Sequence, residues 1–111
     1  MNWIQLNSEE QLNQIQEKSN TVPQVIFKHS TRCSTSSMVL NRLERAVVPD
    51  NMDYYYLDLL NHRNISNKIA EIFHVFHESP QILLIKNGEC IYDESHMAIN
   101  TNDLISFAAQ N

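Results

Sequence analysis

Glycine is nearly absent from this chain, since Gly88 is the only one among 111 residues. Phosphate-binding loops of the dinucleotide-binding and P-loop types depend on several spaced glycines, so the sequence excludes both. Basic residues are also few, because 8 Lys and Arg stand against 13 Asp and Glu, for a formal net charge of −5. A protein that binds the phosphate backbone needs a dense basic face, so we expect no nucleic-acid partner.

Cysteine and long apolar runs are scarce as well. The two cysteines, Cys33 and Cys90, are too few for a four-thiolate zinc site and stand far apart in the chain. No apolar run exceeds four residues, which is too short to cross a membrane, and the first residues lack the pattern of a secretory signal. We therefore expect one domain over residues 1–111, monomeric and cytoplasmic, with reduced thiols and no membrane partner.

Hydrophobic periodicity and turn signals divide the chain into helices and strands. A capping box at 8–11 opens the first helix, Pro49 stops the second, and Asn87-Gly88 is a strong hairpin signal. The expected elements are a helix to about Lys18, a strand at 24–29, a helix before Pro49, a strand at 54–59, a helix whose inner stripe is Ile65, Ile69, Ile72, Phe73 and Phe76, strands at 81–86 and 89–93, and a helix capped by Asn100 or Thr101.

This order predicts an α/β fold. Strands that alternate with helices require parallel pairing through right-handed crossovers, and the hairpin adds an antiparallel edge. The result is a four-stranded mixed sheet with helices on both faces, in the order of the thioredoxin-like fold. A ferredoxin-like order would place two strands between its two helices, and it does not fit. In such sheets, chemistry is found where the carboxyl end of a strand meets the next helix.

Cys33 occupies that position, between the strand at 24–29 and the second helix. A thiol at a helix N-terminus faces free backbone N–H groups and the positive end of the helix dipole, which favour the thiolate. Arg32 adds positive charge, and the hydroxyls of Ser34 and Ser36 can donate to the sulfur or cap the helix. An inert structural cysteine is the alternative, but it prefers apolar neighbours, and these are polar. We therefore interpret Cys33 as a catalytic thiol.

The spacing around Cys33 restricts the chemistry. A dithiol oxidoreductase carries C-x-x-C, whose second cysteine resolves a mixed disulfide, but Ser36 occupies that place. A monothiol centre can accept or donate a mixed disulfide, and a second molecule must resolve it. Cys90 is the only other thiol, and we interpret it as a packing residue rather than a resolving one.

Pro80 stands directly before the strand at 81–86. At this place the thioredoxin-like fold carries a cis proline opposite the helix-terminal cysteine, in a loop whose backbone can pair with a peptide or a thiol adduct. From the sequence alone a trans proline is the more frequent case, but the element order favours cis. We therefore predict a cis Ser79–Pro80 bond and a contact between the Pro80 ring and the Cys33 sulfur.

Together these segments resemble the bacilliredoxin-like proteins of the bacillithiol system, which belong to the thioredoxin superfamily. The matching segments are 27–33 (Phe-Lys-His-Ser-Thr-Arg-Cys) with Ser36, then 78–81, 85–88, and Ser95-His96 followed by Ile99. The resemblance implies a monothiol oxidoreductase that takes a small thiol from a protein–bacillithiol mixed disulfide onto its own cysteine and is reset by another thiol. The implied partners are thiolated client proteins and a bacillithiol-like co-substrate, with no other cofactor.

By the same resemblance, Cys33 is the nucleophile, Ser36 fills the resolving place, and Thr31, Ser79 and Pro80 bind substrate. The chain departs from the family at Ser34, because proline commonly follows the cysteine. Proline at the first helical position pre-sets the turn, so its loss bears on the rate of exchange but not on the position of the thiol.

Histidines carry weaker signals. His74-x-x-His77 places two imidazoles on neighbouring turns, but a metal site needs a third ligand, either His62 or His96, brought close by folding. We therefore predict no metal site. His29 can tune the thiol or simply cover the edge of the sheet, and we favour the second interpretation.

Two classes of function stay open. The first is a thiol–disulfide exchange enzyme that acts through Cys33. The second is a non-catalytic thioredoxin-fold module that binds proteins through the Pro80 loop and in which the cysteine is incidental. The pH dependence of the reaction of Cys33 with alkylating reagents separates them, because an activated thiol departs from the behaviour of free cysteine.

Overall fold

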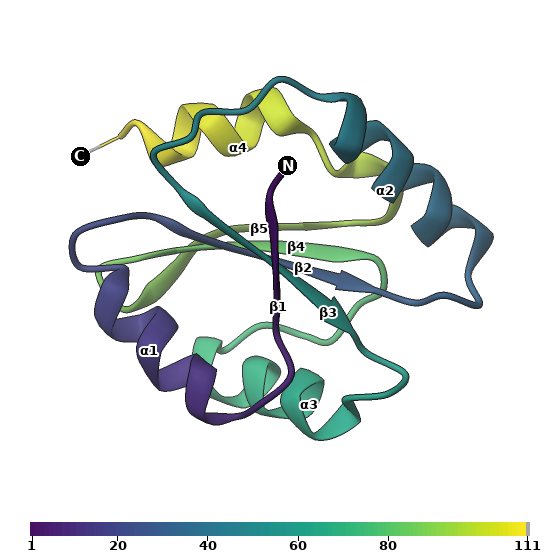
Figure 1. Ribbon diagram of the computed structural model, residues 1–111, viewed down its shortest axis with the longest axis horizontal. Coiled ribbons are helices and arrows are strands. Elements are labelled where there is room, and N and C mark those ends of the chain that lie inside the picture. Colours follow the sequence, from purple (N-terminus) through teal and green to yellow (C-terminus); the bar gives the residue numbers. More distant parts are fainter. Residues whose placement is uncertain (111) are drawn as a thin grey trace.

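A five-stranded mixed sheet forms the middle layer of the computed structural model, which describes residues 1–110 (Figure 1). Asn111, the last residue of the predicted domain, lies outside the described residues. The strands are β1 (Trp3–Gln5), β2 (Gln24–His29), β3 (Asp53–Asp58), β4 (Gln81–Lys86) and β5 (Glu89–Ser95), in the spatial order β1-β3-β2-β4-β5. β3 pairs in parallel with β1 and β2, whereas β4 pairs antiparallel with β2 and β5.

Four helices cover the two faces of this sheet. They are α1 (Glu10–Lys18), α2 (Ser34–Arg45), α3 (Arg63–Phe73) and α4 (Thr101–Ala108), and a short 3-10 helix, η1 (His96–Ala98), precedes α4. α1 and α3 lie on one face, and α2 and α4 lie on the other (Figure 1). Both faces of the central strand β2 are therefore covered, which explains why all six of its residues are buried.

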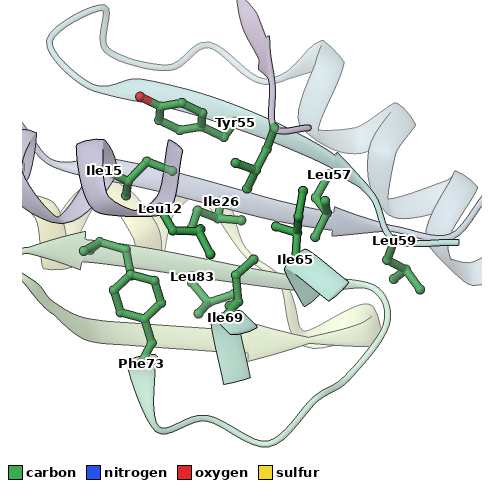
Figure 2. Packing of buried hydrophobic residues seen from close by; sticks show 12 residues of the cluster. Leu12, Ile15, Ile26, Tyr55, Leu57, Leu59, Ile65, Ile69, Phe73 and Leu83 are labelled. Carbon is green, nitrogen blue, oxygen red and sulfur yellow. The ribbon is translucent and has the colours of Figure 1, made fainter. Parts of the chain in front are cut away.

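Two apolar clusters join the helices to the sheet. Figure 2 shows the cluster on the α1 and α3 face, where side chains of both helices converge on Ile26 of β2 and Leu83 of β4. On the other face, Val25 and Phe27 of β2 pack with Val39 and Leu43 of α2. Neighbouring residues of β2 thus face opposite clusters, as the two-residue period of a strand requires.

β1 is the strand that the sequence did not predict. Its three residues pair with β3 from Trp3↔Tyr54 to Gln5↔Tyr56, and the indole of Trp3 stacks on Phe27 with ring centroids 5.8 Å apart. A segment this short carries no alternation of its own, so pairing with β3 decides its conformation. The prediction of four strands is therefore wrong, because β1 adds a fifth strand at the edge of the sheet.

Two helix ends also differ from the expectation. α3 ends at Phe73, because His74 adopts a left-handed conformation (φ 57°) that turns the chain away. Phe76 consequently lies beyond the helix and is 92% exposed, so its predicted place on the inner stripe is wrong. At α1, Gln11 Oε1 accepts from the N–H of Asn7 (2.8 Å) and Ser8 (3.0 Å), but Ser8 caps nothing in return.

Local turn signals are confirmed elsewhere. Asn87 (φ 55°) and Gly88 (φ 79°) form the hairpin turn between β4 and β5 with two positive φ angles. The Asn100 side chain caps α4 by accepting from the N–H groups of Asn102 (2.8 Å) and Asp103 (3.2 Å). In residues 1–110, no helix has both the length and the apolar character needed to span a bilayer.

Candidate active site

Cys33 is the residue from which α2 begins. It is the N-cap, with an extended backbone (φ −109°, ψ 118°); its N–H donates to the Ser30 carbonyl (3.2 Å), and its own carbonyl accepts from the Ser37 N–H (3.1 Å). The turn at 30–33 therefore delivers the thiol to the N-terminus of the helix, where it is partly exposed. No side chain caps the first turn of α2 and no acidic residue lies in it, so its positive end is left to the sulfur.

Of the three residues predicted to stabilise the thiolate, two are exposed and one is buried. Arg32 and Ser34 flank Cys33 and are exposed. Ser36 is fully buried, and its hydroxyl lies 2.7 Å from Nδ1 of His29 and accepts from the Ser30 N–H at 3.1 Å. The hydroxyl in the resolving place is thus held against β2, and the sulfur is not among its hydrogen-bond partners.

His29 connects β2 to α2 rather than covering a sheet edge, so the favoured interpretation of this residue is wrong. It is buried, and its ring lies 5.9 Å from Phe27 and 5.5 Å from Tyr56, centroid to centroid. Burial lowers the pKa of His29, and the charge of Asp58 partly opposes this change. A neutral imidazole therefore holds Ser36, and with it the first turn of α2, in place.

Pro80 lies at the same end of the sheet as Cys33. The β2–β4 register pairs Lys28 with Gln81, so Pro80 stands beside the end of β2. The Ser79–Pro80 peptide bond is cis, the isomer that the sequence predicts. The Pro80 carbonyl accepts from the His96 N–H (2.9 Å), which ties this loop to η1. The direct contact between the Pro80 ring and the sulfur stays a prediction.

Sequence reasoning missed a buried lysine behind this loop. Lys28 is completely buried, and its Nζ lies 2.8 Å from Nδ1 of His77, which is also 3.2 Å from the Ser66 hydroxyl of α3. Burial lowers the pKa of Lys28 to about 8, against the opposing charge of Glu78. His77 belongs to the segment between α3 and Pro80, so this contact anchors the loop to the sheet. Nothing in the sequence around Lys28 signals a lysine that points inward.

Cys90 lies at the other end of the sheet. It is paired with Ile85, which in turn is paired with Gln24 at the start of β2. At about 3.3 Å per residue, Cys90 is therefore at least about 16 Å from the end of β2 from which Cys33 follows, whereas a disulfide needs Cβ atoms about 4 Å apart. Cys90 packs against the α1 and α3 cluster, as predicted, and its thiol donates to the Tyr92 carbonyl (3.3 Å).

The histidines do not assemble with other ligands. Within the described part of the chain, no three His, Cys, Asp or Glu side chains are grouped so that they could hold a metal ion. His77 is bound to Lys28, and His96 lies 3.8 Å from a Glu78 carboxylate oxygen on the surface. His74 occupies the left-handed residue after α3, so His74 and His77 do not share a helix face.

Thr31 and Arg32, the two residues that precede Cys33 in the chain, line an open hollow of about 390 Å³. The other wall comes from the segment after β3, with Leu60, Asn61 and Arg63. Of these residues, only Thr31 and Arg32 are expected at the site from the sequence. The second wall follows from the parallel pairing of β2 and β3, which brings the ends of both strands to the same edge.

Comparison with known proteins finds a matching family and similar solved structures for this chain. Residues 4–104 match the family described as monothiol bacilliredoxin BrxC. A candidate oxidoreductase with a thioredoxin fold is 32% identical and superposes with a TM-score of 0.81 over 94% of this chain and 91% of that one.

Two thioredoxins share the fold at lower identity. Fasciola hepatica thioredoxin is 16% identical, with a TM-score of 0.75 over 94% of this chain and 97% of that one. Trypanosoma brucei brucei thioredoxin is 17% identical, with a TM-score of 0.73 over 95% and 86%. The thioredoxin-like fold predicted from the order of elements is confirmed.

Proposed function

Because the chain belongs to the monothiol bacilliredoxin family, whose fold is that of thiol oxidoreductases, we propose that it removes a bacillithiol-type small thiol from protein mixed disulfides through Cys33. The observation that carries this proposal is that Cys33 has no second cysteine near it. Cys33 is partly exposed at a helix N-terminus, Ser36 stands in the resolving place, and Cys90 lies at the far end of the sheet. The reduced thiols that this chemistry needs are typical of the cytoplasm, where we place the protein.

The proposed reaction has two exchange steps. The Cys33 thiolate attacks the sulfur of the small thiol, so that a Cys33–small thiol disulfide forms while the client protein leaves as a thiolate and takes a proton from water. An external thiol then attacks the adduct, forms a new disulfide with the small thiol and returns Cys33 to the thiolate. Each step breaks one S–S bond and makes one, so no other oxidant or reductant is needed.

Residues around Cys33 support these steps. Cys33 lies at the uncapped first turn of α2, and the exposed Arg32 precedes it in the chain. The Ser36 hydroxyl cannot displace a thiol, because an alcohol is not ionised near neutral pH, so the adduct waits for an outside molecule. The Ser79–Pro80 loop lies beside the end of β2 from which Cys33 follows, and in this proposal its backbone pairs with an extended client segment.

An exposed aromatic residue favours a second candidate, the non-catalytic binding module. Phe76 is 92% exposed in the segment before Pro80, and it offers an apolar contact to a partner protein. In this alternative the same loop binds proteins and Cys33 takes no part.

Turnover separates the two candidates. Catalytic amounts of the protein are mixed with an excess of a peptide–small thiol mixed disulfide and an external thiol, and released peptide is followed by mass. The proposal predicts many peptides released per Cys33. Release no faster than without protein, together with alkylation of Cys33 like free cysteine at every pH, would leave the binding module.

A further inference from the structure

Two buried polar side chains lie beneath the 74–80 segment, which connects α3 to β4 and ends in the cis proline. They are Lys28 of β2 and Gln81 of β4, with 0% and 1% of their surface exposed. Resting on the function proposed above, we infer that this buried polar pair, Lys28 and Gln81, sets the position of the Ser79–Pro80 backbone and thereby the rate at which peptide clients react. Both are positioning residues, because they act through the loop and not on the reacting sulfurs.

The β2–β4 register brings the two side chains together. Lys28 is paired with Gln81, and directly paired residues of antiparallel strands point to the same face of the sheet. That face is the one covered by α1 and α3, because Ile26, two residues before Lys28, belongs to the apolar cluster of these helices. The 74–80 segment follows α3 on the same face, so both side chains point toward it.

Together the buried polar pair holds three consecutive residues of this segment. Nε2 of Gln81 donates to the Phe76 carbonyl (3.0 Å), and its Oε1 accepts from the Glu78 N–H (3.4 Å). Between these two residues, Nζ of Lys28 donates to Nδ1 of His77 (2.8 Å). The backbone just before the cis proline is therefore tied to the ends of β2 and β4.

The Ser79–Pro80 peptide is consequently fixed from both sides. Glu78, directly before it, is held by the buried polar pair, and the carbonyl of the proline accepts from the His96 N–H (2.9 Å). Apolar packing ends earlier in the segment, because Val75 packs against the α1 and α3 cluster whereas Phe76 is 92% exposed. Polar contacts therefore decide where this peptide lies.

The protonation states of Lys28 and His77 fit their contact. An ammonium has no acceptor, so Nζ donates and Nδ1 accepts, which requires a neutral imidazole. Burial lowers the pKa of His77 and the charge of Lys28 lowers it further, against the opposing charge of Glu78, so the ring is neutral at pH 7.

Lys28 is an unusual choice for a buried position. Within residues 1–110, Nδ1 of His77 is the one hydrogen-bond partner of its ammonium. A buried ammonium is unfavourable, and an apolar side chain of similar size is expected to stabilise the fold at least as well. Stability alone therefore does not account for Lys28, whereas the placement of the loop does.

The test compares two disulfides that deliver the same small thiol to Cys33. One is an extended, uncharged peptide whose single cysteine is joined to mercaptoethanol. The other is the symmetric disulfide of mercaptoethanol, which has no backbone for the loop to pair with. In both, the Cys33 thiolate bonds to a mercaptoethanol sulfur, the S–S bond breaks, and the other half leaves as a thiolate. Intact mass at pH 7 gives both rates, and the ratio of peptide to symmetric disulfide cancels changes in the thiol itself.

Lys28→Met and Gln81→Leu should each lower the rate with the peptide by about tenfold and leave the rate with the symmetric disulfide within about twofold, because a displaced loop no longer orients the peptide. His77→Ala should give the same loss. It removes the contact from the exposed side, so it tests the inference even where the buried replacements do not fold. The double variant of Lys28→Met with His77→Ala should lose no more than either single variant, since both remove one contact.

Gln24→Leu is the matched control. Gln24 is also a fully buried glutamine, but it lies at the opposite end of the sheet, where its Nε2 donates to the Val22 carbonyl (3.0 Å) and to Oδ2 of Asp53 (2.8 Å). Its replacement should leave the ratio within about twofold. A fall as large as that in Gln81→Leu would mean that general loosening of the sheet is responsible, and the inference would be overturned.

The outcomes separate the inference from the proposed function. If no small thiol reaches Cys33 in the native protein, the proposed function is wrong and the inference fails with it. If exchange occurs and the ratio is unchanged in Lys28→Met, Gln81→Leu and His77→Ala, the inference is wrong and the proposed function stands. If both rates fall together in these variants, the side chains support the thiol or the fold rather than the loop, and the inference is again overturned.

Discussion

The two cysteines lie at opposite ends of one sheet, and their surroundings differ. Cys33 follows the carboxyl end of β2, partly exposed at an uncapped helix N-terminus. Cys90 lies on β5 at the end of the sheet where β2 begins, and it packs on an apolar cluster. Burial raises its pKa to about 11, with a further contribution from Asp93. The same side chain is therefore placed for exchange at one end and kept as a thiol at the other.

The sharpest way to break this comparison is to remove each thiol in turn. Cys33→Ser should abolish uptake of a small thiol, because the serine hydroxyl is not ionised near neutral pH and is a poor nucleophile toward sulfur. Cys90→Ser should leave the uptake rate within about twofold, since Cys90 is far from the reacting atoms. Intact mass after incubation with a mixed disulfide measures both. Uptake that survives in Cys33→Ser would show that the assignment of the nucleophile is wrong.

Ser36→Cys should bring a second thiol to the Cys33 end. Position 36 lies three residues after Cys33, so the new thiol is on the same side of the helix as Cys33 and within bridging range. It can therefore expel the adduct internally. We expect the lifetime of the adduct without external thiol to fall by at least about a hundredfold.

Ser36→Ala is the control for that change, because it removes the contacts of Ser36 with Ser30 and His29 without adding a thiol. It should keep the adduct while losing about 1–2 kcal/mol of stability in urea unfolding. An adduct equally short-lived in Ser36→Ala would mean that local loosening, and not the new thiol, releases it.

Alkylation sharpens the comparison without a mutation. With a pKa of about 11, Cys90 carries about one thiolate per thousand thiols at pH 8, so iodoacetamide should label Cys33 and spare Cys90 in the native protein. In urea both should be labelled. Peptide mapping of the two cysteines between pH 7 and 9 measures this. Equal labelling of both in the folded protein would contradict the account of Cys90.

Lys28 is a buried group at the same end of the sheet as Cys33, and its ionisation affects the stability of the fold. Its pKa is lowered to about 8, so the folded protein is penalised for the buried ammonium below pH 8, and this penalty disappears as the pH rises from about 8 toward the usual lysine value of 10.5. Relative to Lys28→Met, the wild type should therefore gain stability over this range, by up to about 3 kcal/mol.

Urea unfolding of the two proteins at pH 7.5 and 9.5 measures this difference, and the subtraction removes the tyrosines and Cys90 that titrate in both. A constant difference between the two proteins across this range would show that Lys28 is solvated.

Sequence alone predicts the features that depend on local signals. The position of Cys33, the Asn87-Gly88 turn and the Asn100 cap all follow from residues within one or two turns of each other, and the structure places them as expected. The element order was enough to predict the fold, although β1 was missing, because β1 is ordered by its partner strand.

The missed parts of the site depend on register between distant segments. Lys28 of β2 contacts His77 in the segment after α3. Arg63 lines the same hollow as Arg32 only because β2 and β3 are parallel neighbours. The error at Phe76 has a similar origin, since the apolar spacing continues past Phe73 while the backbone of His74 ends the helix. A spacing pattern shows which residues can share a face, but not where the chain turns.

The most direct test of the central claim is the lifetime of the small-thiol adduct on Cys33 in the wild type and in Cys90→Ser, followed by intact mass without external thiol. The account predicts that both proteins hold one adduct and release it at the same rate only when a thiol is added. If the wild type sheds its adduct and forms an internal Cys33–Cys90 disulfide while Cys90→Ser keeps the adduct, Cys90 is the resolving residue and the monothiol account is contradicted.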